Sequence, residues 1–296
     1  MDARPDKGLQ APPPWEIAAP ARQTVPLVFA SPHSGSDYPP EFIQASRLDP
    51  LSLRRSEDSY VDEIFGSAPE LGAPLIRALF PRAYIDPNRE PFELDPTMFA
   101  DGLPSYANTG SPRVAAGFGT IARVVTGGEE IYRGKLRFAE ALRRIDSFYR
   151  PYHAALKALI EETRVRFGGC LLVDCHSMPS VGGPAARDAG AKGADFVLGD
   201  CHGAACAAAV IDTAEKALTS LGYAVARNTP YAGGFTIRHY GRPAEGVHVL
   251  QIEINRALYM DEETMERGPY LPRLADHMSA LAAALAPVGE AVLARP

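Results

Sequence analysis

The chain has 296 residues, of which 46% are hydrophobic, and it carries a formal net charge of -6. A chain of this size can bury a sizeable core, as one large α/β domain or two small ones. Lys and Arg are scattered along the sequence, so no basic face for nucleic acid is evident. The sequence shows neither a hydrophobic run long enough to span a bilayer nor an N-terminal secretory pattern. We therefore expect a cytoplasmic protein that binds a small molecule and neither nucleic acid nor a membrane.

The order of predicted elements indicates an α/β fold. Residues 1–23 are rich in Pro and Ala and are expected to form a loosely packed or mobile tail, whereas 24–296 are expected to form a single α/β domain. Apolar runs bounded by turn residues predict strands at 25–30, 75–85 (one or two strands), 170–174, 194–198, 223–227 and 247–254. Helical spacing predicts helices at 50–68, at 129–166 with a kink or break at Pro151, at 204–221, and at 272–285, which Pro287 ends. Alternation of strands and helices predicts a mostly parallel sheet with helices on both faces.

Two segments lack regular spacing. Residues 90–128 are rich in Gly, Pro, Asn and Ser, and a loop of this length in a compact domain is commonly a lid or a binding loop. Residues 231–241 form a second, glycine-marked loop before the last predicted strand.

Two histidines follow or end predicted strands. His33 comes just after the strand 25–30, and His176 comes just after the strand 170–174. Because ligands bind at the carboxyl edge of an open α/β sheet, we expect both imidazoles to reach one shared site. Asp58 is predicted at the margin of the buried face of its helix, and Glu253 interrupts the last apolar strand, where an unpaired charge would be costly.

These residue types suit metal-assisted hydrolysis. Two imidazoles and one carboxylate that leave a position open are the ligand set of a catalytic zinc, and a further carboxylate can take a proton from water. Glu253 is the candidate for that second role. His33 and His176 could each be an ordinary hydrogen-bonded histidine instead, and Asp58 could be a solvated helix residue. His202 is a rival ligand, because the Asp-Cys-His order around His176 recurs at 200–202.

Six ordered motifs resemble those of the N-formylglutamate amidohydrolase family. They are Ser31-Pro32-His33-Ser34-Gly35, Glu57-Asp58-Ser59-Tyr60-Val61-Asp62, Asp86-Pro87-Asn88-Arg89, Asp174-Cys175-His176-Ser177, Gly233-Gly234-Phe235-Thr236-Ile237-Arg238-His239-Tyr240-Gly241 and Gln251-Ile252-Glu253-Ile254-Asn255. The resemblance covers about residues 25–262. It implies a three-layer α/β/α sandwich like that of zinc-dependent exopeptidases, and hydrolysis of the N-acyl amide of an acidic amino acid such as N-formylglutamate, as in histidine degradation.

The resemblance also implies a ligand set. His33, Asp58 and His176 are expected to bind the metal, and Glu253 is expected to act as the base. Related exopeptidases often have a glutamate ligand three residues after the first histidine, where this chain has a serine. The carboxylate must therefore come from elsewhere, and Glu57 is an alternative to Asp58. Zinc is the expected cofactor, with Co, Mn or Fe as alternatives.

The same resemblance implies residues that hold the substrate. Asn88 and Arg89 resemble the pair that binds a substrate carboxylate in related zinc exopeptidases. Arg238 is expected to bind a carboxylate too or to stabilise the oxyanion, and its neighbour His239 is expected to contact substrate. Arg89 could instead pair with a nearby carboxylate of its own segment.

Two other functions are compatible with the sequence. Cys175 or Ser177 could be a nucleophile with a histidine as its base. We rank this below the metal hypothesis, because neighbours along a strand point to opposite faces and Cys175 would not readily meet His176. The chain could also be a binding protein that holds an acidic ligand without turning it over.

Overall fold

The fold is built around one mixed β-sheet. The structure is a computed structural model of the chain and describes residues 12–180 and 193–293. Within these residues, seven strands pair in the order β1-β3-β2-β4-β7-β5-β6. The strands are β1 (Trp15–Ala18), β2 (Leu27–Ser31), β3 (Leu75–Ala78), β4 (Cys170–Met178), β5 (Phe196–Gly199), β6 (Val225–Arg227) and β7 (Val247–Asn255). Strands β3, β2, β4 and β7 run parallel to one another, as do β5 and β6, whereas β1 and β5 pair antiparallel with β3 and β7. The mostly parallel mixed sheet is confirmed.

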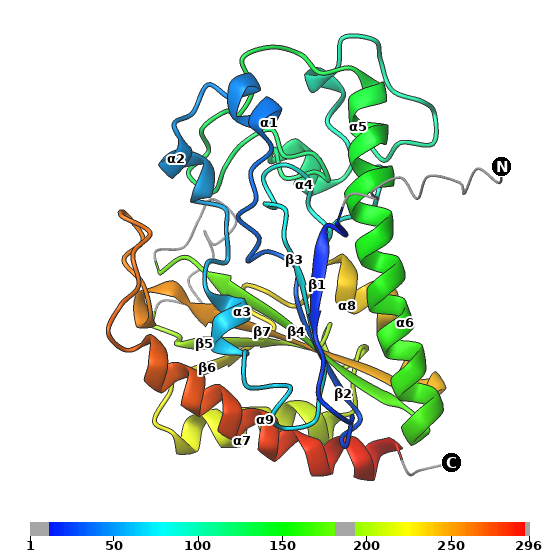
Figure 1. Cartoon of the computed structure of the whole chain (residues 1–296), viewed down its shortest axis with the longest axis vertical. Helices are drawn as coiled ribbons and strands as arrows, with labels where there is room; N and C mark the ends of the chain where they lie inside the picture. The colour runs from blue at the N-terminus through cyan, green and yellow to red at the C-terminus, as the bar shows by residue number, and fades with distance from the viewer. Residues whose placement is uncertain (1–11, 181–192, 294–296) are drawn as a thin grey trace, which may run out of the picture.

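Helices cover both faces of this sheet (Figure 1). They are α1 (Pro40–Ala45), α2 (Pro50–Arg54), α3 (Val61–Ile64), α4 (Pro112–Ala115), α5 (Phe138–Arg144), α6 (Arg150–Phe167), α7 (Ala208–Ser220), α8 (Phe235–Tyr240) and α9 (Leu271–Leu293). None of them, over the ranges that the structure describes, is both long and apolar enough to cross a membrane.

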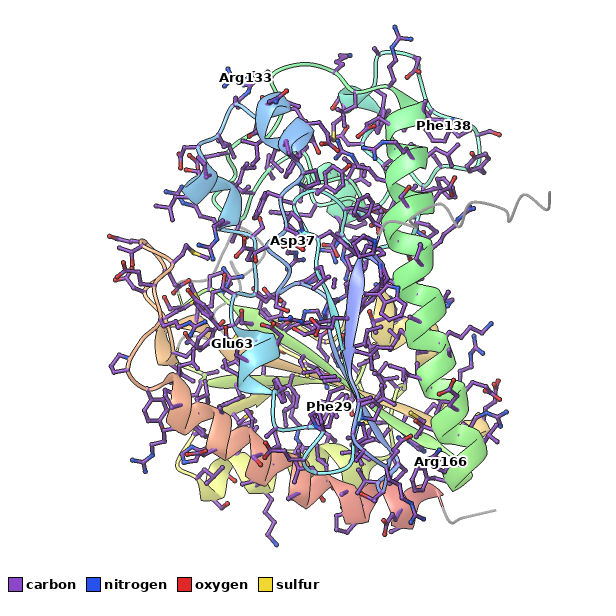
Figure 2. The ribbon with its side chains drawn as sticks, in the orientation of Figure 1. Phe29, Asp37, Glu63, Arg133, Phe138 and Arg166 are labelled. Carbon is purple, nitrogen blue, oxygen red and sulfur yellow. The ribbon has the colours of Figure 1, made fainter. Side chains whose placement is uncertain are left out.

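The apolar core lies in two layers, one on each face of the sheet. Phe29 and Val173 pack with α3, α7 and α9 on one face, whereas Val28 and Leu172 pack with α6 on the other. Successive side chains of a strand point to opposite faces, so each central strand supplies both layers. Figure 2 shows Phe29 within the first of these layers. The expected three-layer α/β/α sandwich is confirmed.

Strand β1 was not predicted. It lies in the stretch that we expected to be a tail, and it pairs with β3 from Trp15 opposite Ala78 to Ala18 opposite Leu75. Prolines flank these four residues, and proline is tolerated beside an edge strand because one side of such a strand needs no ladder hydrogen bond. Residues 1–11 of the expected tail lie outside the described residues, and the single-domain boundary stays a prediction.

The predicted helix over 50–68 is wrong. The chain forms α2 and α3 with a buried turn between them, and Asp58 lies in that turn. The Asp58 N–H donates to the His33 carbonyl oxygen at 3.0 Å, so it makes no helical bond. Tyr60 has φ of 67°, a left-handed conformation that a right-handed helix cannot pass through. The turn therefore carries the Asp58 carboxylate inward rather than along a helix face.

Two prolines that we expected to interrupt helices do not end them. The first of these helices begins at Phe138 rather than at 129, and α5 passes through a π-helical turn, residues 145–149, into α6. Pro151 lies directly after this π-helical turn, and the helix passes it without a break. Helix α9 continues past Pro287. Beyond Pro287 the helix still packs closely on the start of β2. A Cβ added at Gly289 would lie 3.3 Å from the Pro26 side chain.

Polar side chains gather where the central strands end. Strands β2, β4 and β7 are neighbours and run in the same direction, so their carboxyl ends meet at one edge. His33 follows β2, and His176 near the end of β4 lies directly opposite Glu253 of β7. Helices α1, α2 and α4 gather at the end of the molecule away from α7 and α9 (Figure 1).

Candidate functional site

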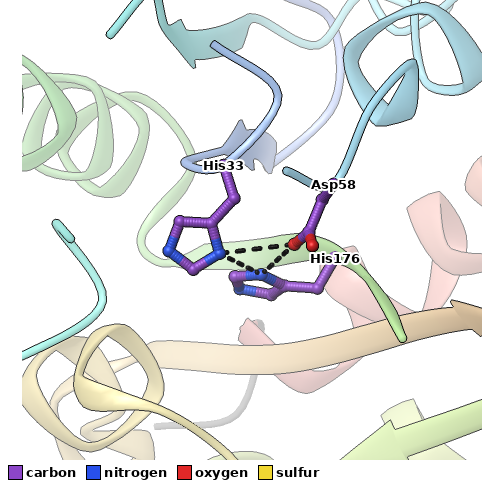
Figure 3. Close-up of side chains that lie close together, drawn as sticks. All are labelled: His33, Asp58 and His176. Carbon is purple, nitrogen blue, oxygen red and sulfur yellow. Dashed lines mark hydrogen bonds and ion pairs between the residues drawn. The ribbon is translucent and has the colours of Figure 1, made fainter. Parts of the chain in front are cut away.

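Three side chains bring their ligand atoms together in the interior (Figure 3). His176 Nδ1 lies 3.1 Å from His33 Nδ1 and 3.1 Å from Asp58 Oδ2, and His33 Nδ1 lies 3.3 Å from the same carboxylate oxygen. All three residues are buried. They come from the turn after β2, the turn between α2 and α3, and β4. The structure thus brings together the three residues that the sequence offered as metal ligands.

The His33 ring is oriented by Asp86. His33 Nε2 lies 2.8 Å from Asp86 Oδ1, and this carboxylate also accepts from the Asn88 N–H at 2.8 Å and from Arg82 Nη2 at 2.9 Å. An ionised carboxylate only accepts hydrogen bonds, so His33 Nε2 must donate and the lone pair is left on Nδ1. His33 therefore presents an acceptor to the other two residues.

His176 lies between two carboxylates. Its Nδ1 is 3.1 Å from Asp58 Oδ2, and its Nε2 is 3.1 Å from Asp174 Oδ2, although this second contact is poorly oriented for a hydrogen bond. Burial disfavours the charged ring, but the negative charge of Asp174 and the close contacts with Asp174 and Asp58 outweigh it and raise the pKa of His176 well above its usual value. The site therefore favours positive charge between His33, Asp58 and His176. Two nitrogen donors and a carboxylate oxygen suit a divalent transition metal at that place.

Asp58, rather than Glu57, faces the imidazoles. Asp58 Oδ1 accepts from Arg256 Nη2 at 2.9 Å, which leaves Oδ2 for the histidines. Burial opposes its charge, but the contacts with His176 and His33 and the positive charge of Arg82 hold the pKa of Asp58 well below its usual range. The Glu57 carboxylate is turned away and accepts from the Tyr38 and Ser59 hydroxyls, each at 2.7 Å. The geometry therefore favours Asp58 as the carboxylate ligand.

A cavity of about 400 Å³ opens beside these residues, and His33, His176 and Glu253 line it. This volume lies within the range of small-molecule sites. Gln251 Nε2 donates to Glu253 Oε1 at 2.9 Å and so fixes the carboxylate. Burial raises the pKa of Glu253 to about 7, the negative charge of Asp58 adds to this, and the charge of His176 opposes it.

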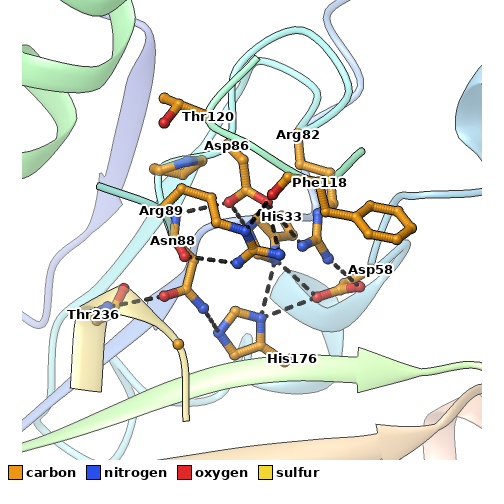
Figure 4. A network of polar contacts seen from close by, with 12 residues as sticks. His33, Asp58, Arg82, Asp86, Asn88, Arg89, Phe118, Thr120, His176 and Thr236 are labelled. Atoms are coloured by element: carbon orange, nitrogen blue, oxygen red, sulfur yellow. Dashed lines mark hydrogen bonds and ion pairs between the residues drawn. The ribbon is translucent and has the colours of Figure 1, made fainter. Parts of the chain in front are cut away.

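Asn88 and Arg89 also line the cavity (Figure 4). Asn88 Oδ1 accepts from the Thr236 N–H at 2.9 Å, and the Asn88 side-chain nitrogen lies 3.3 Å from His176 Nε2. Arg89 donates through Nε to the Phe118 carbonyl oxygen at 2.8 Å and through Nη1 to the Asn88 carbonyl oxygen at 2.8 Å. These bonds fix the guanidinium at the cavity wall.

Arg238 and His239 lie elsewhere. Both are exposed on α8, and neither is among the residues that line the cavity. Arg238 Nη1 donates to the Gly233 carbonyl oxygen at 3.1 Å. The structure thus places these two beside the site rather than in it, and their expected contact with substrate stays a prediction.

Comparison with known proteins identifies the family. The model of the family described as N-formylglutamate amidohydrolase matches residues 25–260. The chain belongs to the N-formylglutamate amidohydrolase family. The family that the sequence motifs indicated is thereby confirmed.

Relatives in this family are similar to the chain over most of its length. A protein named N-formylglutamate deformylase from Pseudomonas aeruginosa is 28% identical over 251 residues, which are 84% of this chain and 87% of that protein. A protein of the same name from Pseudomonas putida is 28% identical over 241 residues, 80% and 83% of the two chains. The crystal structure of N-formylglutamate amidohydrolase from Ralstonia eutropha JMP134 matches with a TM-score of 0.83 and 39% identity, and covers 94% of this chain and 98% of that one.

Several residues of the site were not singled out in the sequence. Asp174 and Gln251 could have been found, because each lies two residues before a predicted site residue on the same strand and therefore on the same face. Arg82, Arg113 and Arg256 also line the cavity, and nothing in their local sequence distinguishes them from surface arginines. Only the fold brings them to the site.

Of the rival residues, Cys175 and His202 lie away from the cavity, whereas Ser177 lines it. Cys175 packs in the apolar layer on the opposite face of the sheet, where burial raises the pKa of its thiol well above the usual value. The Ser177 hydroxyl accepts from Arg256 Nε at 3.2 Å. His202 is exposed in the turn after β5 and is not part of the cluster formed by His33, Asp58 and His176.

Proposed function

We propose that the protein is a metal-dependent amidohydrolase that removes the formyl group from N-formylglutamate or a closely related N-acyl acidic amino acid. The observation that carries this proposal is the buried convergence of His33, Asp58 and His176 beside a cavity that Glu253 also lines. Family membership and the names of the bacterial relatives support the reaction class. A cytoplasmic role in histidine degradation is part of the same proposal.

Zinc is the proposed cofactor, because the donor set mixes imidazole nitrogen with carboxylate oxygen. When bound, a divalent cation supplies Lewis acidity, which lowers the pKa of water towards about 7 and polarises the substrate carbonyl. His33 and His176 would hold it through Nδ1, and Asp58 through Oδ2. Asp86 holds the proton on the outer ring nitrogen of His33, so the Nδ1 lone pair would be free to bind the cation.

Glu253 is the proposed base. It lies opposite His176 in the paired strands and lines the cavity, so its carboxylate can take the proton of the attacking water and deliver it to the departing amine. Gln251 orients Glu253 through the hydrogen bond to Oε1. Arg89 would bind the substrate α-carboxylate through a charge-assisted contact, while Asn88 fixes the position of that arginine's segment beside His176.

The proposal is tested with the purified full chain. Metal content is measured directly, and formate release from N-formylglutamate is followed with and without a chelator. We expect activity to disappear with the metal and to return on adding zinc. Glu253→Gln should retain the metal and lose roughly 100- to 10,000-fold in kcat.

A matched variant distinguishes the metal mechanism from the hypothesis that Cys175 or Ser177 is a nucleophile. Cys175→Ala changes a buried residue on the other face of the same strand and should leave the rate unchanged. If Glu253→Gln hydrolyses N-formylglutamate as fast as the parent while holding the metal, Glu253 is not the base. If the chelated protein keeps full activity and Cys175→Ala or Ser177→Ala loses it, the metal mechanism is wrong. A parent that binds the substrate without hydrolysing it would be a binding protein.

A further inference from the structure

Arg113 lies on the short helix α4, inside the long irregular segment 90–128, and lines the cavity. The Ser111 hydroxyl caps this helix, accepting from the Val114 N–H at 3.0 Å, and it donates to the buried Glu93 carboxylate. The Glu93 backbone in turn accepts from the Thr120 N–H at 2.7 Å. The segment therefore holds Arg113 on a fixed support at the cavity wall.

Two other arginines of the cavity are neutralised within the protein. Arg82 Nη2 lies 2.9 Å from Asp86 Oδ2, and Arg256 Nη2 lies 2.9 Å from Asp58 Oδ1. These two arginines compensate carboxylates of the candidate metal centre. They are not available for a ligand without breaking buried ion pairs.

Among the residues that the structure describes, Arg113 has no such carboxylate partner. Its polar contact is a long one, from Nη2 to the Gly233 carbonyl oxygen at 3.4 Å. Within residues 12–180 and 193–293, no carboxylate oxygen lies within 4.0 Å of an Arg113 guanidinium nitrogen, the distance that defines an ion pair. Burial, with the like charges of Arg89 and Arg238 nearby, lowers the pKa of Arg113 to about 10. A guanidinium stays charged at neutral pH, so this shift records an unfavourable environment that an anionic ligand would relieve.

Arg89 is the other incompletely paired arginine. Its Nη2 is 3.7 Å from Asp86 Oδ2, while Nε and Nη1 are occupied by carbonyl oxygens. Over the part of the chain that the structure describes, Arg113 and Arg89 are thus two cavity arginines that carboxylates do not fully compensate. An N-formyl dicarboxylic amino acid brings two carboxylates, so its charge matches this pair.

We propose that Arg113 determines specificity by binding the side-chain carboxylate of the substrate, while Arg89 binds the α-carboxylate. This inference rests on the proposed function, because it names the carboxylate of that substrate which each arginine binds. The class of substrate is then an N-acyl amino acid with an acidic side chain. A neutral side chain of the same shape would leave Arg113 without its anion.

The experiment compares N-formylglutamate with N-formylglutamine, which have nearly the same shape and differ in side-chain charge. Hydrogen bonds to charged groups contribute about 1.5–3 kcal/mol, so Arg113→Gln should lower kcat/KM for N-formylglutamate roughly 10- to 100-fold, mainly through KM. The value for N-formylglutamine should change by less than about 3-fold, within the scatter of neutral contacts. Arg113→Lys should keep part of the preference, because it keeps the charge without the two-pronged contact.

Arg137→Gln is the matched control. Arg137 is exposed at the start of α5, lies outside the cavity lining, and its replacement changes net charge by the same amount. We expect the control to behave as the parent does on both substrates. Thermal unfolding and metal content of each variant show whether the fold and the metal centre are intact.

Binding of the two free amino acids provides a readout that does not need turnover. Titration calorimetry should show that the parent binds glutamate more tightly than glutamine, and that Arg113→Gln removes this difference. Equal losses on both formyl substrates, no loss on either, or a parent that binds both amino acids equally would each overturn the role of Arg113. A parent that hydrolyses neither formyl substrate but prefers glutamate in an Arg113-dependent way would refute the proposed function and leave this subsite standing.

Discussion

Asp86→Asn tests whether the network around the candidate metal centre sets its affinity. Asp86 contacts the cluster of His33, Asp58 and His176 through one hydrogen bond, from His33 Nε2 to Asp86 Oδ1 at 2.8 Å. Burial opposes its charge, but Arg89, Arg82 and His33 hold the pKa of Asp86 well below its usual range. Asparagine keeps the shape and removes the charge, so the change acts on orientation and proton position rather than on packing.

Either orientation of the new amide is unfavourable. If its oxygen faces His33 and the Asn88 N–H, its NH₂ group faces the Arg82 guanidinium, and two donors then oppose each other. If its NH₂ group faces His33 instead, the ring must carry its proton on Nδ1, which points at the cation. Loss of such a partner costs 10- to 100-fold in metal affinity, or about 1.4 to 2.7 kcal/mol.

Zinc affinity is measured by competition with a chromophoric chelator, on parent and variant. Glu57→Gln is the control, because Glu57 is an equally buried carboxylate beside Asp58 that contacts Tyr38 and Ser59 rather than the imidazoles. We expect the control to keep the parent affinity. If Asp86→Asn binds zinc as tightly as the parent, or Glu57→Gln loses as much affinity as Asp86→Asn does, the assignment of the carboxylates is refuted.

Two further predictions concern the wall of the site. A Cβ at Gly234 would lie 2.2 Å from both Oδ1 and Nδ2 of Asn88, so Gly234→Ala should displace Asn88 and lower kcat/KM roughly 100-fold, whereas Gly134→Ala, which meets nothing within 4 Å, should have no effect. His153 donates to the Pro87 carbonyl oxygen at 2.8 Å, and burial lowers the pKa of His153 to about 4. Its contribution to stability is therefore complete above the unfolded pKa near 6.5 and is lost as pH falls towards 4. Urea unfolding at pH 7 and pH 5 should show a loss of about 2 kcal/mol that His153→Gln does not share, and equal losses in both proteins would contradict this.

Most of the sheet was predictable because its strands contain apolar runs between strong turn signals, whereas the edge strand β1 has no such run and was missed. The same signal located the histidines, since His33 and His176 follow or end apolar runs whose carboxyl ends share an edge. Glu253 was predictable as a charge inside an apolar strand. Helical spacing at 50–68 failed because long-range contacts override local preference. The Asp58 N–H bonds to His33 and its carboxylate bonds to Arg256, which lies 198 positions away in the sequence.

The arginines of the site mark the limit of sequence reasoning. Arg82, Arg113 and Arg256 stand in unrelated local contexts, and the chain contains 30 Lys and Arg residues from which to choose. What distinguishes them is which carboxylate each one meets, or fails to meet, after folding. That information depends on contacts between distant segments, which the local sequence around each arginine does not record.

The two halves of the site are joined at one carboxylate. Asp86 Oδ1 contacts His33, whereas Asp86 Oδ2 contacts Arg82 and lies 3.7 Å from Arg89. A change at Asp86 should therefore weaken metal binding and substrate binding together, because the same group orients a metal ligand and positions a substrate arginine. Arg113 has no contact with this chain of ion pairs, so its replacement should alter substrate preference and leave metal affinity unchanged. Metal affinity and substrate affinity should therefore be measured on both Asp86→Asn and Arg113→Gln. We expect Asp86→Asn to lower both affinities and Arg113→Gln to lower substrate affinity alone.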